Sequence, residues 1–273
     1  MTPELAQAIA AVSEAARALG LEPVLVGAIA GELAVMARPG MPVPRRSNDA
    51  DFAVRLPGWD SYQRLKNALI AVGFVQNQRV EHRLSLGSAL VDLIPYGPGV
   101  SSRQGEITWP GTGNVMSVVG FEEACRESVE GEVQDGVHVN YVEVPGLVLL
   151  KIVAFVDRQA RGDAKHRSDA EDIYFWLTHY PGDAEEARRF EIAETGLRDV
   201  EYLTTGAALL GMDVRPIASL PADAVVNRFL TLAADEYGPF VNAVVSPAFD
   251  DERERVIKYA SAFRAGYGSV EAP

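Results

Sequence analysis

Two acidic residues one position apart, Asp49 and Asp51, are the side chains of this chain best placed to do chemistry. If residues 49–54 form a strand, its period of two directs both carboxylates to one face and sends Ala50 and Phe52 to the other. Two carboxylates this close repel each other unless a cation holds them, and carboxylate oxygens suit Mg²⁺. The pair therefore predicts a divalent-metal site, and a solvated Asp-rich strand start is the alternative.

A third acidic residue, Asp92, interrupts the apolar segment 88–96, which has the pattern of a buried strand. A carboxylate inside such a strand is costly unless a cation or another partner neutralises it. We expect Asp92 to join Asp49 and Asp51 as a ligand of one or two ions of Mg²⁺ or Mn²⁺. Such ions would bridge the phosphates of a nucleotide and activate an attacking oxygen.

Gly27 separates a predicted strand at residues 23–26 from a predicted helix at 28–36. A glycine at a strand-to-helix turn lets a phosphate approach the backbone, where the helix N-terminus offers N–H groups. An ordinary tight turn is the alternative.

The later half of the chain contributes Lys151, which alone breaks the apolar run 147–156. This run is too short to span a bilayer and predicts a buried helix, whose lysine needs an anionic partner. The ammonium group would face a nucleotide phosphate or the acidic cluster, or it would reach water along its stem. Asp169 and Asp172, after a predicted N-cap at Ser168, are three residues apart and share a helix face.

The order of these elements resembles the nucleotidyltransferase superfamily typified by DNA polymerase beta. It is more closely similar to the bacterial AbiEii/AbiGii branch, predicted nucleotidyltransferases that include toxins of type IV toxin–antitoxin systems. The matching segments span roughly residues 20 to 180 and are Val26–Ala30, Arg46–Val54, His82–Leu84, Val91–Gly97, Leu149–Arg158 and Ser168–Ile173.

The resemblance implies an α+β fold: a polymerase beta-like core with a mixed sheet and flanking helices over residues 1–144, then a mainly helical domain over 145–273 that completes the nucleotide site. It implies an enzyme that transfers NMP from an NTP to a hydroxyl of an RNA, such as tRNA, or of a protein. The cellular role would be that of a toxin with a cognate antitoxin.

The resemblance also implies roles for individual residues. Asp49, Asp51 and Asp92 would bind metal, and Asp92 is in addition a candidate base. The catalytic set is Asp49, Asp51, Asp92 and Lys151, and the nucleotide-binding set is Gly27, Ala28, Ser47, Lys151, Asp169 and Asp172. The family pattern has an arginine where this chain has Gly31, and a basic residue where it has Ser168.

The sequence leaves three other functions open. The departures at Gly31 and Ser168 favour a non-catalytic NTP-binding or regulatory module on the same fold, whereas the intact set of three acids argues against it. A metal-dependent phosphohydrolase would use the same acids, and a pure interaction scaffold would use none of them.

Composition limits the range of partners. A net charge of −13 with a pI near 4.8 argues against a general nucleic-acid-binding surface. Local patches at Arg38, Arg45 and Arg46 and at residues 165–167 would converge on tRNA, or they are solvated loops. The single Cys125 excludes an internal disulfide framework and indicates a cytoplasmic protein, and no segment resembles a signal peptide or a membrane span.

Two positions, one imidazole and one indole, have two possible roles each. His82, beside Arg83, would orient substrate or make a structural hydrogen bond. Trp109 would stack on a base or anchor the core. The four histidines lack metal-ligand spacing, so a zinc site is not expected.

Hydrophobic periodicity predicts the remaining elements. Helices are expected at residues 3–19, 59–72, 223–237 and 251–267, and strands on either side of Leu86-Gly87 and at 115–119 and 137–144.

Overall fold

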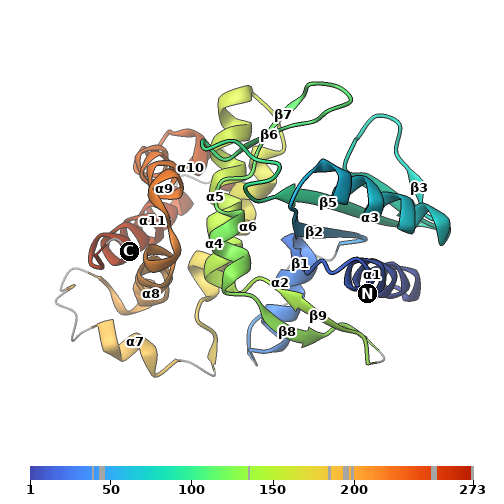
Figure 1. Cartoon of the computed structure of the whole chain (residues 1–273). Helices are drawn as coiled ribbons and strands as arrows, with labels where there is room; N and C mark the ends of the chain where they lie inside the picture. Colours follow the sequence, from blue (N-terminus) through green and yellow to red (C-terminus); the bar gives the residue numbers. More distant parts are fainter. Residues whose placement is uncertain are drawn as a thin grey trace. The chain divides into compact units, whose positions relative to one another are not determined.

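The computed structural model describes residues 1–38, 40–42, 47–134, 136–183, 186–192, 197, 200–246 and 251–271 (Figure 1). Arg45 and Arg46 of the predicted RNA-binding patch lie outside the described residues. The chain divides into two compact units, residues 1–36 with 43–143 and residues 37–42 with 144–273.

The first unit is built on a seven-stranded mixed sheet with the strand order β3-β4-β5-β2-β1-β9-β8. Its strands are β1 (Pro23–Val26), β2 (Asp49–Arg55), β3 (Val75–Gln76), β4 (Arg83–Leu86), β5 (Ala89–Tyr96), β8 (Val129–Glu132) and β9 (His138–Tyr141). β2 pairs in parallel with β5 and β1 in parallel with β9, whereas the other pairs are antiparallel. A separate hairpin joins β6 (Glu106–Thr108) to β7 (Val115–Ser117).

The alternation along β2 explains how this sheet presents acids on one face. Ala50, Phe52 and Val54 are fully buried, while Asp49 and Asp51, which directly precede Ala50 and Phe52, are half-buried. Helix α1 (Pro3–Ala18) packs on the sheet and contacts α3 (Trp59–Ala71). Helix α2 (Gly27–Met36) contacts β1 and β2, and α4 (Phe121–Arg126) contacts β2. The first unit therefore has the sheet-and-helix core that the sequence predicted.

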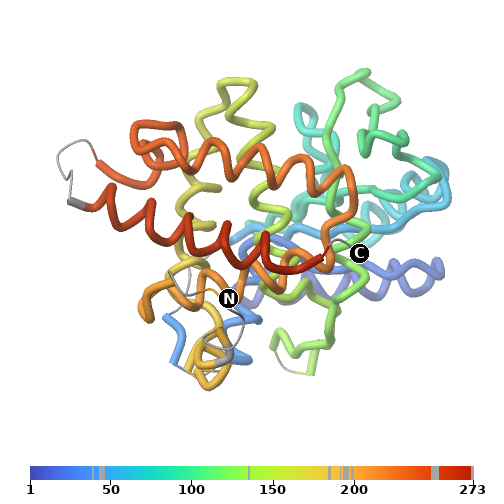
Figure 2. Tube along the Cα trace, turned by 90° about the vertical axis from the view of Figure 1, so that its left-hand side faces the viewer, coloured from blue at the N-terminus to red at the C-terminus, as the bar shows by residue number. Residues whose placement is uncertain are grey.

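The second unit is helical. Its elements are α5 (Val144–Arg161), α6 (His166–His179), α7 (Arg188–Glu191), η3 (Tyr202–Thr204), α8 (Thr205–Val214), η4 (Arg215–Ile217), α9 (Leu220–Ala233), α10 (Pro239–Val244) and α11 (Asp251–Gly268). Figure 2 shows α11 as one long helix, and it packs closely along α8. Glycines permit this approach, because a Cβ at Gly266 would lie 1.9 Å from the carbonyl oxygen of Ala208. Phe155, Phe229 and Phe240 meet edge to face in the core of this unit.

The α+β class is confirmed, with its mixed sheet, flanking helices and helical C-terminal region. Within the described residues, every helix is either too short or too polar to cross a lipid bilayer.

Several helix starts and ends differ from the prediction. Ser168 is not an N-cap, because α6 already begins at His166 and the Ser168 hydroxyl donates to the carbonyl of Lys165 at 2.9 Å within the same turn. α5 continues to Arg161 through a polar stretch, stabilised by an ion pair with Asp157 one turn earlier. α9 begins at Leu220 because the following proline occupies the first turn, where its missing N–H has no cost.

Candidate functional site

The structure brings the three predicted acids onto one face of the first unit's sheet. Asp51 and Asp92 are register partners on the parallel strands β2 and β5. Neighbouring strands lie about 4.8 Å apart, and Asp49, two residues earlier on β2, shares their face. The side chain of Asp92 is only 8% exposed, whereas that of Asp49 is 40% exposed. The cluster therefore has a buried end at Asp92 and an open end at Asp49.

Among the described residues, Arg83 is the main basic partner of Asp92 and Asp49. It lies opposite Asp92 on the antiparallel pair β4–β5, and its Nε and Nη2 donate to Oδ1 and Oδ2 of Asp92, both at 2.7 Å. The same Nη2 lies 3.7 Å from Oδ2 of Asp49. The hydrogen bond to Asp92 raises the pKa of Arg83, and the negative charges of Asp92, Asp49 and Asp51 raise it further. One guanidinium is thus under the influence of all three carboxylates.

His82 and Trp109 lie beside the buried end of the cluster. His82 Nε2 is 3.7 Å from Oδ2 of Asp92, and its ring lies against the indole of Trp109 with centroids 5.8 Å apart. Trp109 is 5% exposed and also packs on Trp59 and Tyr62. A buried indole presents no open face to a base, so the structure favours the anchoring role for Trp109 over base stacking.

Gly27 is required by the approach of Asp51. It has a φ of +69°, and a Cβ placed there would lie 2.2 Å from Oδ2 of Asp51. The carboxylate therefore packs against the turn where β1 ends and α2 begins, near the positive end of the helix dipole. Ala28, predicted with Gly27 to bind phosphate, lies in the first turn of this helix.

Ser47 orients the open end of the cluster. Its hydroxyl donates to Oδ1 of Asp49 at 2.8 Å, and its backbone N–H points to Oε1 of Glu32 at 3.4 Å. Glu32, which directly follows Gly31 in the sequence and was not predicted to belong to the site, thus adds a fourth carboxylate beside Ser47. The signal that could have found it is its spacing of one helical turn from Ala28 on α2.

The predicted metal ligands are not preassembled as a coordination sphere. In the part of the chain that the structure describes, no group of three or more His, Cys, Asp or Glu side chains is arranged to hold a metal ion. Arg83 instead engages both oxygens of Asp92. The donor set nevertheless fits a hard cation, because Asp49, Asp51 and Asp92 offer carboxylate oxygens on one face with one end open to solvent.

Lys151, Asp169 and Asp172 meet within the second unit. Lys151 Nζ on α5 lies 2.7 Å from Oδ2 of Asp172 and 3.5 Å from Oδ1 of Asp169, both on α6. Arg158 Nη1 lies 2.6 Å from the other oxygen of Asp169. The lysine thus has the anionic partner that its burial requires, and that partner comes from the neighbouring helix. Arg158 was not predicted to take part, because it lies beyond the apolar run 147–156 from which this helix was recognised.

This network predicts unequal roles for its two cations. Asp169 is 1% exposed, and its Oδ1 accepts no hydrogen bond from the described residues, so its charge depends mainly on Arg158. We expect Arg158→Met to lower the free energy of unfolding by about 3 kcal/mol, as for other buried carboxylates that lose a partner. Lys151→Met should lower it by about 1 kcal/mol, because Asp172 can then turn to water. Urea unfolding of both variants measures the difference, and equal losses would contradict this ranking.

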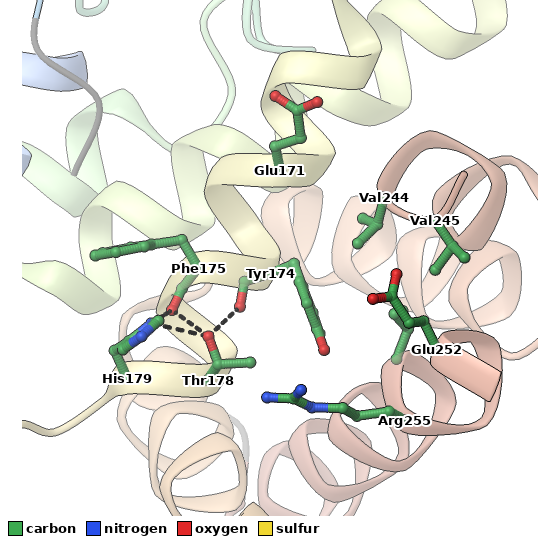
Figure 3. Close-up of a pocket in the computed structure, with 10 residues that line it drawn as sticks. Glu171, Tyr174, Phe175, Thr178, His179, Val244, Val245, Glu252 and Arg255 are labelled. Atoms are coloured by element: carbon green, nitrogen blue, oxygen red, sulfur yellow. Dashed lines mark hydrogen bonds between the residues drawn. The ribbon is translucent and has the colours of Figure 1, made fainter. Parts of the chain in front are cut away.

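A cavity of about 440 Å³ lies within the second unit (Figure 3). It is lined by Tyr174, Phe175 and Thr178 of α6 and by Glu252 and Arg255 of α11, among others. None of the residues predicted to act in function lines it.

Cys125, in the first unit, is buried, and burial raises the pKa of its thiol to about 12, as expected for a cysteine without a nucleophilic role.

Comparisons with known proteins identify remote structural similarities. No protein-family model matches the sequence, and no curated protein matches it. A solution structure of the antibiotic-resistance factor ANT(2'')-Ia is similar with a TM-score of 0.42 and 14% identity, covering 85% of this chain and 96% of that chain. A crystal structure of ANT(2'')-Ia in complex with adenylyl-2''-tobramycin gives a TM-score of 0.40 and 15% identity, covering 82% and 98%. A similarity this remote assigns neither a family nor an activity to this chain.

Proposed function

We propose that this protein is a metal-dependent nucleotidyltransferase that transfers NMP from an NTP to a hydroxyl of an RNA, such as tRNA, or of a protein. The observation that supports this most is the shared face of Asp49, Asp51 and Asp92, with Asp51 and Asp92 in register on parallel strands. Three carboxylates on one face repel each other, and the single positive charge of Arg83 leaves this cluster net negative, which favours binding of a divalent cation.

In the proposed reaction, residues of the first unit have separate roles. Asp49, Asp51 and Asp92 would hold Mg²⁺ or Mn²⁺, which when bound supplies positive charge to the triphosphate and lowers the pKa of the attacking hydroxyl. Asp92 is the candidate base that accepts the hydroxyl proton. The acceptor oxygen then bonds to the α-phosphorus as the bond to the β-phosphate breaks, and pyrophosphate leaves. Ser47 fixes the orientation of Asp49 through its hydrogen bond.

Roles for the second unit rest on the resemblance alone. We propose that Lys151, Asp169 and Asp172 contribute to nucleotide binding, although their contacts with one another are also what helix packing by itself would require. Loss of nucleotide affinity in Lys151→Met beyond any loss of stability would support this role.

A labelling experiment tests the activity. The purified chain is incubated with Mg²⁺ and each of the four NTPs carrying an α-³²P label, together with tRNA, total RNA or cell protein. We expect covalent label on one acceptor with the parent chain and none with Asp49→Asn. Nucleotide that binds without becoming covalently attached would favour the non-catalytic module, to which the neutralisation of Asp92 by Arg83 lends some support. Release of free nucleotide without an acceptor would indicate a phosphohydrolase.

The cellular role that we infer from the resemblance is that of a cytoplasmic toxin of a type IV system, held in check by a cognate antitoxin. Expression of the parent chain in a bacterial host should then arrest growth, whereas Asp49→Asn at the same protein level should not. Equal growth with both chains, at matched expression, would contradict the toxin role.

A further inference from the structure

We propose that Arg83 is a built-in counter-cation of the acidic cluster, which a divalent ion must displace from Asp49 and Asp92 in order to bind there. This inference rests on the proposed function, because it assumes that the three carboxylates bind a metal ion. Arg83 would act as a positioning residue that holds the carboxylates together in the metal-free protein.

The hydrogen bonds of Arg83 place it in competition with a metal ion. Both oxygens of Asp92 accept N–H groups of the guanidinium at 2.7 Å, and Nη2 extends across β5 to lie 3.7 Å from Asp49 on β2. A cation that used these oxygens would face a second positive charge within a few Å, which is strongly unfavourable at a site as buried as Asp92. The two cations therefore exclude each other from this carboxylate.

The Arg83 side chain can move away from Asp92 without disrupting β4. The Arg83 N–H donates to Val80 and its carbonyl accepts from Asn77, so the backbone of β4 is held independently of the guanidinium. The side chain is 25% exposed and has a long flexible stem. A phosphate that arrives with the metal ion would offer the displaced guanidinium a new bidentate partner.

Titration with Mn²⁺ tests the proposal without measuring activity. Electron paramagnetic resonance of free Mn²⁺ gives the dissociation constant for the parent, Arg83→Ala and Arg64→Ala. Arg64 lies exposed on α3, so this control removes the same net charge away from the cluster. We expect Arg83→Ala to bind Mn²⁺ about tenfold more tightly than the parent, because one nearby repulsive charge is removed. Arg64→Ala should differ from the parent by less than about twofold, since exposed charges are screened.

The same variants should differ in their unfolding temperatures. Without metal, Arg83→Ala should unfold at a lower temperature than the parent, and saturating Mn²⁺ should raise its Tm by more than it raises that of the parent. If Arg83→Ala does not fold, Arg83→Gln repeats the test, because glutamine can still donate a hydrogen bond to Asp92 but carries no charge.

Two results would overturn the proposal in distinguishable ways. Saturable Mn²⁺ binding that is equal or weaker in Arg83→Ala would reject the role of Arg83 and leave the proposed function standing. No saturable binding in either the parent or Arg83→Ala would reject the metal site itself, and with it the inference.

Discussion

The variant Asp51→Asn should lose nucleotidyl transfer by at least a factor of about a hundred, while its fold and its free energy of unfolding stay within about 1 kcal/mol of the parent. Asp51 is the centre of the cluster, with Val26 as its register partner on β1 and Asp92 on β5. Asparagine keeps the shape of the side chain but removes one negative charge and one metal ligand. The free energy of unfolding changes little because the substitution removes one of three mutually repelling charges.

The measurement is the rate of α-³²P transfer together with urea unfolding of the same preparations. Asp60→Asn is the matched control, since Asp60 is an exposed acid in the first turn of α3. That change should cost only a few tenths of a kcal/mol through the helix dipole and leave transfer intact. Transfer by Asp51→Asn at more than half of the parent rate would contradict the account.

Gly27→Ala should lower activity on the order of a hundredfold, although the substitution adds a single methyl group. The new Cβ would lie 2.2 Å from Oδ2 of Asp51, so the carboxylate must turn away from its place in the cluster. The left-handed backbone, with φ of +69°, adds strain of about 1 kcal/mol. This variant should therefore lose activity and stability together.

Gly20→Ala is a closely matched control. Gly20 has the same φ of +69°, but a Cβ there meets nothing within 4 Å. It should show the loss of about 1 kcal/mol from strain and keep full activity. If the two variants lose activity equally, the contact between Gly27 and Asp51 is not what positions the carboxylate.

Much of the site could be predicted because it follows from local periodicity. The alternation of β2 is sufficient to place Asp49 and Asp51 on one face, and the apolar run around Asp92 identifies a second buried strand. Gly27, at the end of β1, could be recognised as a turn residue. The reason that a glycine is needed there could not be predicted. Gly27 makes room for Asp51, and that contact depends on the pairing of β1 with β2, which no local pattern specifies.

The salt bridges could not be predicted because they depend on register and on helix packing. Arg83 meets Asp92 because the turn at Gly87 aligns these two positions across β4 and β5. A shift of one residue would send the guanidinium to the opposite face. In the second unit, Lys151 was expected to need an anion, but only the packing of α5 on α6 shows that Asp169 and Asp172 supply it.

The proposed function requires that Asp49, Asp51 and Asp92 together hold a divalent ion. The most direct test is a crystal structure of the whole chain with Mn²⁺ and a non-hydrolysable NTP, with anomalous diffraction to locate the metal. Binding at this cluster should give an anomalous peak about 2.1 Å from oxygens of Asp49, Asp51 and Asp92, with Arg83 no longer in bidentate contact with Asp92. A peak elsewhere, or a bound nucleotide with Arg83 and Asp92 still paired and no metal beside them, would contradict it.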